Sequence, residues 1–346
     1  MHETYLHRCL ELARQAAGYT APNPMVGAVL VHEGRIIGEG WHRQYGGPHA
    51  EPNCIASVAE ADQPLIPQST MYVSLEPCAH FGKTPPCADL IVRNRIPRVV
   101  IGARDPFVQV DGKGIDKLKA AGVDVTVGVL EEASTELNKR FFTFHTKHRP
   151  YIILKWAQTA NGFIGNDDHS RLMISNALTN RTVHKWRSEE AAILVGTNTA
   201  LFDDPRLNTR HWEGPSPIRA VVDMDLRLPA SLKLFDGTAR TIVFNTKQHA
   251  GEGTVQYYQV TRDVSLVHQV ANALYQQNIL SVLVEGGAQL LQSFIDEGYW
   301  DEARIITNET LRVDSGIRAP ELGAATLLET TTLENDTIRI LKKAEG

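Results

Sequence analysis

Several features that would mark a special class of protein are scarce in this sequence. Only 4 of its 346 residues are cysteine, too few for a disulfide-stapled scaffold in so long a chain. The N-terminus lacks the basic and apolar segments of a signal peptide, and no apolar run is long enough to span a bilayer. These absences predict a cytoplasmic protein with no membrane partner.

An excess of positive charge is also missing. The chain has 35 Lys and Arg against 40 Asp and Glu, a formal net charge of −5. Proteins dedicated to nucleic acids normally have a basic excess or a basic stripe. We therefore expect no nucleic-acid partner. The hydrophobic share of 42% and the charged share of 22% are typical of a globular protein and exclude long disordered regions.

Internal repeats and low-complexity segments are absent too, which excludes a solenoid. The length of 346 residues exceeds the size at which one hydrophobic core usually stops growing, so two domains are expected. Apolar runs alternate with helical patterns in both halves, which indicates two α/β domains. A polar stretch at 145–150 ends in proline, and we place the domains at 1–146 and 147–346.

The patterns predict the following elements. Strands are expected at 25–31, 35–40, 70–75, 98–101, 123–129, 151–156, 191–195, 218–222, 241–244, 281–285 and 304–307. Helices are expected at 5–17, 49–61, 88–94, 113–121, 179–188, 265–277 and 288–297. The C-terminal residues 336–346 could pair as a last strand or fray.

One group of residues in the first half is typical of a catalytic metal site. His49 opens a predicted helix, Cys78 follows a predicted strand, and Cys87 lies at the start of the next helix. One imidazole and two thiolates leave the fourth position of a zinc ion open for water, whose pKa zinc lowers to roughly 7. Glu51 can reach that water without binding the metal and pass its proton to a leaving amine. This pattern is described for zinc-dependent base deaminases as a class.

The alternative is an ordinary helix start beside buried thiols. His-x-Glu alone would favour that alternative, but Pro77-Cys78 after a strand together with Cys87 favours the metal site. Cys9 and Cys54 lack such a context and are expected in the core. Helical geometry turns Cys54 away from the metal.

The spacing of the cysteines narrows the family. Most zinc base deaminases have Cys-x-x-Cys, whereas eight residues separate the two cysteines of the run Glu76-Pro77-Cys78-Ala79-His80-Phe81-Gly82-Lys83-Thr84-Pro85-Pro86-Cys87. This run, together with segments 21–29 and 102–106, resembles the bifunctional deaminase/reductase of riboflavin biosynthesis, and the resemblance extends through the second half. It implies a cytidine-deaminase-like, three-layer α/β/α domain. This domain would remove an amino group hydrolytically from a diamino-hydroxypyrimidine that bears a phosphoribosylamino group.

The resemblance also implies which residues of the first domain hold the substrate: Asn23, His42, Lys83 and Asp105. An amide at Asn23 offers a donor and an acceptor to a pyrimidine edge, and Lys83 offers a point charge to a phosphate. Taken alone, Asn23 before Pro24 is also a common turn residue, and Lys83 a common surface residue.

The second half lacks the Gly-x-Gly-x-x-Gly fingerprint of dinucleotide-binding folds. Two strand-to-helix turns, 196–199 and 285–287, contain glycines and open helices, which suits phosphate, although tight turns look the same. The resemblance implies a dihydrofolate-reductase-like α/β domain that uses NADPH to reduce the ribosyl group to a ribityl chain.

In that domain the resemblance assigns two sets of residues. The substrate-side residues are Lys155, Arg187, Leu207, Arg210 and Glu285, and the cofactor-side residues are Thr199, Asp203, Gly286 and Gly287. Asp203 also matches a substrate-side position. Arg187 and Arg210 could clamp a phosphate, because guanidinium groups bind it bidentately. Arg187 could instead be a surface cation near a helix C-terminus.

Two positions depart from the family pattern. Thr159-Ala160-Asn161-Gly162 stands where the family usually has Ser-Leu-Asp-Gly, so an amide replaces a carboxylate. Met173 stands where the family often has Trp, and either Ser170 or Arg171 takes a substrate-binding serine position. A weakened reductase is therefore an open alternative.

We conclude that the sequence favours a bifunctional enzyme that uses Zn²⁺ and NADPH on phosphoribosylated pyrimidines. One alternative is a deaminase of another amino-pyrimidine with an inactive second domain, but a free base would not need Lys83. A non-catalytic zinc-stabilised binding protein would need a fourth ligand and no acid at Glu51. A nucleic-acid deaminase is inconsistent with the net negative charge of the chain. A homo-oligomer is compatible with the sequence, which does not define the oligomeric state.

Overall fold

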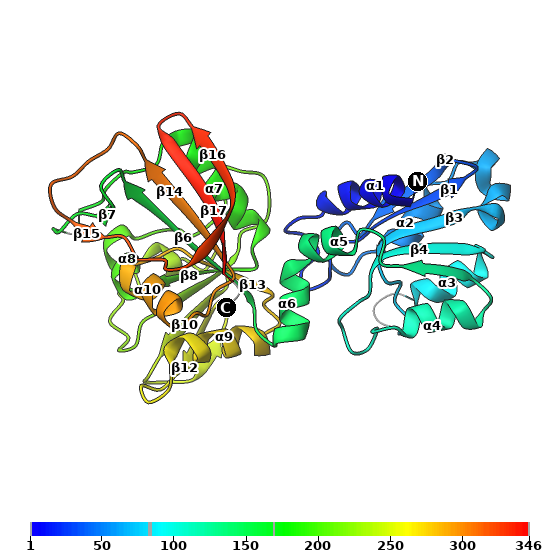
Figure 1. Cartoon of the computed structure of the whole chain (residues 1–346). Coiled ribbons are helices and arrows are strands. Elements are labelled where there is room, and N and C mark those ends of the chain that lie inside the picture. Colours follow the sequence, from blue (N-terminus) through cyan, green and yellow to red (C-terminus); the bar gives the residue numbers. More distant parts are fainter. Residues whose placement is uncertain (1, 82–84, 169, 345–346) are drawn as a thin grey trace. The chain divides into compact units, whose positions relative to one another are not determined.

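The computed structural model of the chain describes residues 2–81, 85–168 and 170–344. The chain forms two compact units, Met1–His148 and Arg149–Gly346, which divide two residues after the predicted boundary. Figure 1 shows that each unit has its own sheet with helices around it. None of the helices in the described part of the chain has the length and apolar character that crossing a membrane requires.

The first unit contains one sheet. Its elements are α1 (His2–Arg14), β1 (Gly27–His32), β2 (Arg35–Trp41), α2 (Ala50–Ala56), the 3-10 helix η1 (Glu60–Gln68), β3 (Thr70–Leu75), α3 (Cys87–Arg93), β4 (Arg98–Ala103), α4 (Lys113–Ala120), β5 (Asp124–Val127), α5 (Glu131–Leu137) and α6 (Lys139–Lys147). The strand order is β2-β1-β3-β4-β5. β1 is antiparallel to β2 and β3, whereas β3, β4 and β5 are parallel.

Both faces of this sheet are covered, because successive strand residues point to opposite faces. Val29 and Tyr72 pack against the apolar face of α1. Leu30 and Val73 point the other way, into a core that includes residues of α2, α3 and α4. The predicted three-layer α/β/α architecture of this unit is thereby confirmed.

The second unit is built on a larger sheet. Its elements are β6 (Tyr151–Thr159), β7 (Phe163–Gly165), α7 (Ala177–Glu189), β8 (Ala192–Gly196), α8 (Thr197–Asp203), β9 (Ile218–Val222), the 3-10 helix η2 (Lys233–Phe235), β10 (Thr241–Asn245), β11 (Ala250–Glu252), β12 (Val255–Gln259), α9 (Leu266–Gln276), β13 (Ser281–Val284), α10 (Ala288–Asp296), β14 (Glu302–Asn308), β15 (Ile317–Arg318), β16 (Ala325–Leu333) and β17 (Asp336–Lys343). Ten strands follow the order β11-β12-β10-β9-β8-β13-β6-β14-β17-β16, and β7 pairs with β15 separately. The seven strands from β12 to β14 in that order are parallel, and β11, β17 and β16 extend the sheet in antiparallel fashion.

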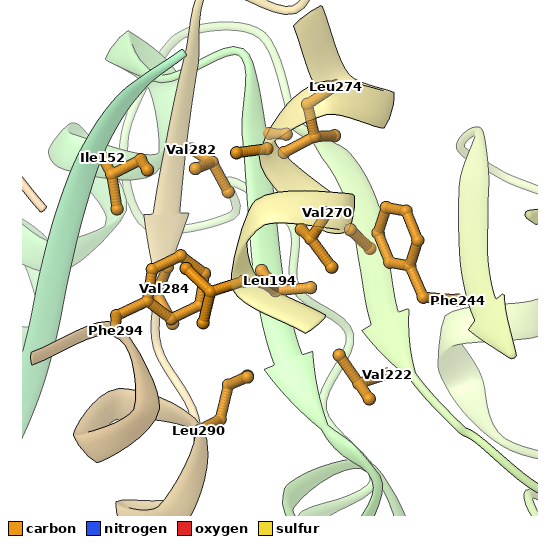
Figure 2. Packing of buried hydrophobic residues seen from close by; sticks show 14 of the residues in the cluster. Ile152, Leu194, Val222, Phe244, Val270, Leu274, Val282, Val284, Leu290 and Phe294 are labelled. Carbon is orange, nitrogen blue, oxygen red and sulfur yellow. The ribbon is translucent and has the colours of Figure 1, made fainter. Parts of the chain in front are cut away.

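The main core of the second unit lies under α9 and α10. Figure 2 shows Val270 of α9 beside Leu194 of β8, and Phe294 of α10 beside Val284 of β13; Leu274 of α9 belongs to the same buried cluster. Burying an aliphatic or aromatic side chain of this kind contributes about 1.5–3 kcal/mol. This cluster therefore fixes β13 between its neighbours β8 and β6.

The position of β13 determines where a ligand can bind. β8, β9 and β10 lie on one side of β13, and β6 and β14 lie on the other. In open parallel sheets, ligands bind beyond the carboxyl ends of strands at such a reversal of strand order. The predicted residue Glu285 follows β13 at that end.

Some elements differ from the sequence prediction. The helix predicted to run to residue 61 ends at Ala56, because the Ser57 hydroxyl bonds to the Cys54 carbonyl oxygen and competes with the helical pattern. The polar stretch at 145–150 begins inside α6 instead of in a linker. Residues 336–343 pair as β17, the last strand along the chain, and do not fray. The helices α5 and α6 and the strands β7, β11, β12, β15 and β16 were not predicted. Apart from α6, whose end overlaps the polar stretch at 145–150, they are short or largely exposed, so apolar periodicity does not mark them.

Candidate active sites

The three predicted metal ligands converge at the carboxyl end of β3. His49 is the residue before α2, Cys78 follows β3, and Cys87 is the first residue of α3. One ligand atom from each lies within 4.8 Å of the others. The His49 Nδ1 atom is 3.6 Å from the Cys78 Sγ and 3.4 Å from the Cys87 Sγ. A donor set of one nitrogen and two sulfurs, with room for a fourth ligand, fits catalytic zinc.

The start of α3 favours a thiolate at Cys78. The Cys87 amide donates to the Cys78 Sγ at 3.4 Å, and the Ala88 amide donates to the Cys78 carbonyl oxygen at 3.1 Å. The Cys87 side chain, through its hydrogen bond, lowers the pKa of Cys78 to about 4, and the same bond raises the pKa of Cys87. The thiolate is the form that binds a metal. The hydrogen bonds at the start of α3 thus favour metal binding at Cys78.

Glu51 lies beside these ligands in the first turn of α2. Its side chain shares a hydrogen bond with Cys87, and the residue is only 3% exposed. Burial raises the pKa of Glu51 above its ordinary value. A carboxyl group whose pKa is raised towards neutrality accepts and returns protons more readily.

The geometry of Asn23 and His42 defines what Asn23 can offer a substrate. The His42 Nδ1 lies 3.0 Å from the Pro48 carbonyl oxygen, which can only accept, so Nδ1 must donate. Burial lowers the pKa of His42, so the ring is neutral and its Nε2 accepts from the Asn23 Nδ2 at 3.1 Å. These bonds assign the tautomer and the amide orientation. The Asn23 Oδ1 is thereby directed to accept from another donor.

The remaining predicted substrate residues of this unit are Asp105 and Lys83. Asp105 follows β4, is 6% exposed and accepts a hydrogen bond from the Phe107 amide at 2.8 Å. Burial raises the pKa of Asp105 to about 7. Lys83 lies outside the described residues. Cys9 and Cys54 are buried in hydrophobic cores, as predicted.

The second unit brings three predicted residues together in a largely buried ionic group. Arg187 forms two hydrogen bonds with Glu285, at 2.8 Å and 2.6 Å, and the Lys155 Nζ lies 3.7 Å from the same carboxylate. Burial opposes ionisation of Glu285, but the charges of Arg187 and Lys155 hold its pKa at about 2. Burial also lowers the pKa of Lys155. Arg187 is thus no surface cation, and its charge is matched by Glu285.

The pairing of Arg187 changes the expected phosphate clamp. Burial, followed by the charges of Arg187, Arg171 and Arg206, lowers the pKa of Arg210. Arg171, Arg206 and Arg210 are exposed, so an anion can reach all three. A guanidinium cluster of this kind suits a phosphate better than the predicted pair of Arg187 and Arg210.

Two other features organise the segment that contains Arg210. Leu207 is 2% exposed in a hydrophobic cluster and has a positive φ of 51°, so its side chain cannot contact a substrate and only its backbone could. The His184 Nδ1 accepts from the Arg210 amide at 3.1 Å. Burial lowers the pKa of His184 to about 4, which keeps that acceptor available at neutral pH.

The predicted cofactor residues surround the start of α10. Gly287 is the residue before α10 and has a positive φ of 77°, and no side chain in the described part of the chain caps this helix start. A Cβ atom on Gly286 would lie 3.0 Å from the Cγ2 of Thr199, so glycine allows α8 to approach the turn. Free helix-start amides and the helix dipole favour a phosphate group. Asp203 is exposed at the last residue of α8.

The two positions that depart from the family pattern have different surroundings. The Asn161 Nδ2 donates to the Val313 carbonyl oxygen at 2.7 Å, and its Oδ1 accepts from the Thr159 hydroxyl at 2.9 Å. Met173 is 61% exposed. The Ser170 hydroxyl accepts from Asn166, whereas the Arg171 charge acts on Asp203 and Arg210. Arg171 thus belongs to the charged group around Arg210, whereas Ser170 is held beside Asn166.

Sequence reasoning gave no role to Arg206, His184 or Glu76, which the structure places at or behind the two sites. Arg206 and His184 stand near Arg210, and Glu76 lies two residues before Cys78. Glu76 belongs to the run that carried the family resemblance, and a charged residue between a buried strand and a metal ligand is a signal that could have drawn attention to it.

Comparisons with known proteins agree with this geometry. Residues 1–103 match the family described as the cytidine and deoxycytidylate deaminase zinc-binding region, and residues 150–311 match the RibD C-terminal domain. The riboflavin biosynthesis protein RibD of Aquifex aeolicus (strain VF5) is 40% identical over 332 residues, which cover 92% of each chain. The protein of the same name from Escherichia coli (strain K12) is 32% identical over 87% of this chain and 85% of its own. A crystal structure of a diaminohydroxyphosphoribosylaminopyrimidine deaminase/5-amino-6-(5-phosphoribosylamino)uracil reductase from Thermotoga maritima is 35% identical, with a TM-score of 0.90 and coverage of 99% of both chains.

Proposed function

This chain belongs to the RibD family of riboflavin-biosynthesis proteins, and from that premise we propose how its own residues perform the two reactions of the family. It is a bifunctional enzyme with a zinc-dependent deaminase domain and an NADPH-dependent reductase domain. We assign deamination to Met1–His148 and reduction to Arg149–Gly346. The substrate of the first unit is 2,5-diamino-6-(phosphoribosylamino)pyrimidin-4-one, and its aminouracil product is reduced by the second.

In the first unit, His49, Cys78 and Cys87 hold the zinc ion. Bound zinc supplies a Lewis acid that makes water a nucleophile at neutral pH. The Glu51 carboxylate takes a proton from the attacking water and returns it to the departing amino group. This assignment is supported above all by one observation: Glu51 is buried in hydrogen-bonding contact with a zinc ligand yet is not itself part of the ligand cluster.

Substrate binding in the first unit follows from the polar groups around the metal. The Asn23 Oδ1 accepts a hydrogen bond from an amino or ring N–H group of the pyrimidine, because His42 already binds the Asn23 amide nitrogen. Asp105 is buried with a raised pKa and contacts the heterocycle from the β4 side. Lys83 contributes a cation for the phosphate.

In the second unit, the turn at Gly286-Gly287 and Thr199 of α8 bind NADPH, and the exposed Asp203 lies on the cofactor side. NADPH supplies the hydride, so the protein residues position the sugar. Lys155 and Glu285 face the ribosyl group, and Arg187 keeps Glu285 ionised. Arg171, Arg206 and Arg210 hold the phosphate, and the backbone of Leu207 lines the same segment.

The experiment that tests this function follows ammonia release and NADPH oxidation together on the diamino substrate. We expect ammonia first and NADPH oxidation after a lag. Removing zinc with a chelator should abolish ammonia release but leave NADPH oxidation intact when the aminouracil is supplied directly. No ammonia from zinc-loaded protein would contradict the substrate, and ammonia without NADPH oxidation would indicate an idle second unit.

Three smaller expectations belong to the same proposal. We propose that the enzyme works in the cytoplasm, which fractionation of cells that express the chain can check. We also propose that it has no nucleic-acid partner. Gel-filtration mass measurement distinguishes a monomer from a homo-oligomer.

A further inference from the structure

Glu76 is a buried carboxylate that collects backbone hydrogen bonds. It lies between β3 and the zinc ligand Cys78 and is 4% exposed. Its Oε2 accepts from the amides of Asp105 at 3.3 Å and Gly112 at 3.0 Å. Its Oε1 accepts from two further amides, those of Gly114 at 3.0 Å and Ile115 at 3.2 Å. All four donors belong to one segment, 105–115, which connects β4 with the first turn of α4.

Two glycines allow this segment to approach Glu76. A Cβ atom on Gly114 would lie 1.9 Å from the Pro77 carbonyl oxygen, a distance that no other residue could accommodate without movement of the backbone. Gly112 has a positive φ of 84°, a conformation that glycine adopts at little cost. The segment is therefore shaped to deliver its amides to this carboxylate.

The hydrogen bonds join two walls of the deaminase site. One wall is the loop that contains Cys78, and the other is segment 105–115, which begins with Asp105. The two also meet where the rings of His80 and Phe107 lie 6.1 Å apart, edge to face. Because the Asp105 amide itself donates to Glu76, the carboxylate determines where the backbone of Asp105 lies relative to the zinc ligands.

We propose that Glu76 is a positioning residue of the deaminase, which holds segment 105–115 so that Asp105 meets the pyrimidine in the correct register. The proposal rests on the proposed deaminase function of this unit. A carboxylate suits this role because each of its oxygens accepts two hydrogen bonds. Glutamine has one carbonyl oxygen, and its amide group would face two N–H donors, so two of the four bonds would be lost in either orientation.

The test is Glu76→Gln in the full-length, zinc-loaded enzyme. We expect the KM for the diamino substrate to rise about tenfold or more, the order expected when hydrogen bonds to a charged group are lost. The kcat, the zinc content per chain and NADPH oxidation with the aminouracil should stay close to those of the unmodified enzyme. Glu39→Gln is the matched control: it removes a carboxylate of the same unit that pairs with Arg8, and it should leave the KM unchanged.

A double variant separates positioning from general support of the fold. Asp105→Asn alone should raise the KM, and adding Glu76→Gln to it should add little, because both changes act on one contact. Additive effects of the two changes, an unchanged KM, or a joint loss of zinc and kcat would each overturn the proposal. Ammonia release by the unmodified enzyme tests the function independently of these variants.

A milder variant keeps the proposal testable if Glu76→Gln does not fold. Gly112→Ala strains the donor segment without changing any charge, because alanine adopts a φ of 84° only at a cost. The effect is mild because the added Cβ would meet only the flexible end of Arg104. We expect the same rise in KM, smaller in size and again absent in the Asp105→Asn background. An unchanged KM in this variant would overturn the proposal.

Discussion

The two units bury one glutamate each at the centre of a site, and they treat it in opposite ways. Glu51 is 3% exposed, and no salt bridge to it occurs among the residues that the structure describes. Glu285 is similarly buried, with 6% of its side chain exposed, but it faces Arg187 and Lys155. Burial raises the pKa of Glu51, whereas the two cations hold the pKa of Glu285 at about 2.

This difference teaches that burial alone does not assign a role to a carboxylate. The Glu51 environment makes protonation easy, which a proton-transfer group needs. The Glu285 environment keeps the group ionised through the whole working range of pH, which suits a fixed charge that orients Lys155. Removing each carboxylate should therefore damage a different property of the molecule.

The largest effect is expected from Glu51→Gln. The amide keeps the size of the side chain but cannot take up a proton, so ammonia release should fall about 10²- to 10⁴-fold, the usual contribution of general acid–base catalysis. Zinc content and NADPH oxidation with the aminouracil should not change. Steady-state assays of both half-reactions measure this, and a loss of less than about tenfold would remove Glu51 from its assigned role.

Glu285→Gln should instead reduce the stability of the second unit. It leaves Arg187 and Lys155 buried without a countercharge, and breaking a buried ion pair by removing one partner costs about 3–5 kcal/mol. Four of the 5 tryptophans, Trp156, Trp186, Trp212 and Trp300, lie in this unit, so tryptophan fluorescence in a Trp41→Phe background follows its unfolding by urea.

The control for that measurement is Glu321→Gln, an exposed position in the same unit. Its free energy of unfolding should stay within about 0.5 kcal/mol of the unmodified chain, as for most surface substitutions. Ammonia release should survive Glu285→Gln. If the second unit of Glu285→Gln kept its full stability, the ionic group of Glu285, Arg187 and Lys155 would not stabilise the fold.

The interaction of Glu285 with Arg187 and Lys155 also predicts how the stability of the second unit depends on pH. The folded-state pKa of Glu285 is about 2 and its ordinary value is 4.5, so its contribution is complete above about pH 4.5 and is lost as the pH falls towards 2. The full effect is about 3 kcal/mol, since each unit of pKa difference corresponds to about 1.4 kcal/mol. The urea midpoint of the unmodified chain, measured by tryptophan fluorescence, should therefore fall as the pH is lowered from about 4.5 to about 2. It should fall less in Glu285→Gln, and equal slopes would contradict the assignment.

The metal centre was predictable from sequence because its information is local. His49 and Glu51 share one turn, and Cys78 and Cys87 share one short loop, so spacing alone brings the members of each pair together. The two pairs then meet through the fold, at the carboxyl end of β3. Both α/β units were predictable for the same reason. Their strands are continuous apolar runs that alternate with helical patterns along the chain. The family resemblance added the substrate and the second activity, which no local pattern contains.

The reductase site was harder to predict because it depends on pairing across the sheet. Arg187 and Glu285 meet only because β13 inserts between β8 and β6, an order that the sequence pattern does not specify. Arg171 approaches Arg206 and Arg210 only in the folded unit, so the sequence alone did not group these three cations. The Leu207 side chain is buried in a hydrophobic cluster and its backbone has a positive φ, a conformation that sequence patterns rarely indicate for leucine.

The smallest effect is expected at a position where an amide replaces the family's usual carboxylate. The Asn161 Nδ2 donates to the Val313 carbonyl oxygen, and its Oδ1 also accepts from the Val313 amide at 3.4 Å. Asn161→Asp keeps the acceptor but sets a carboxylate against that carbonyl oxygen, so the second unit should lose about 1 kcal/mol of stability. The kcat and KM of NADPH oxidation should stay unchanged, because both polar atoms of Asn161 already serve the turn. An increase in NADPH turnover would show instead that position 161 acts as Glu285 does, as a charge at the site, and that the amide limits this enzyme.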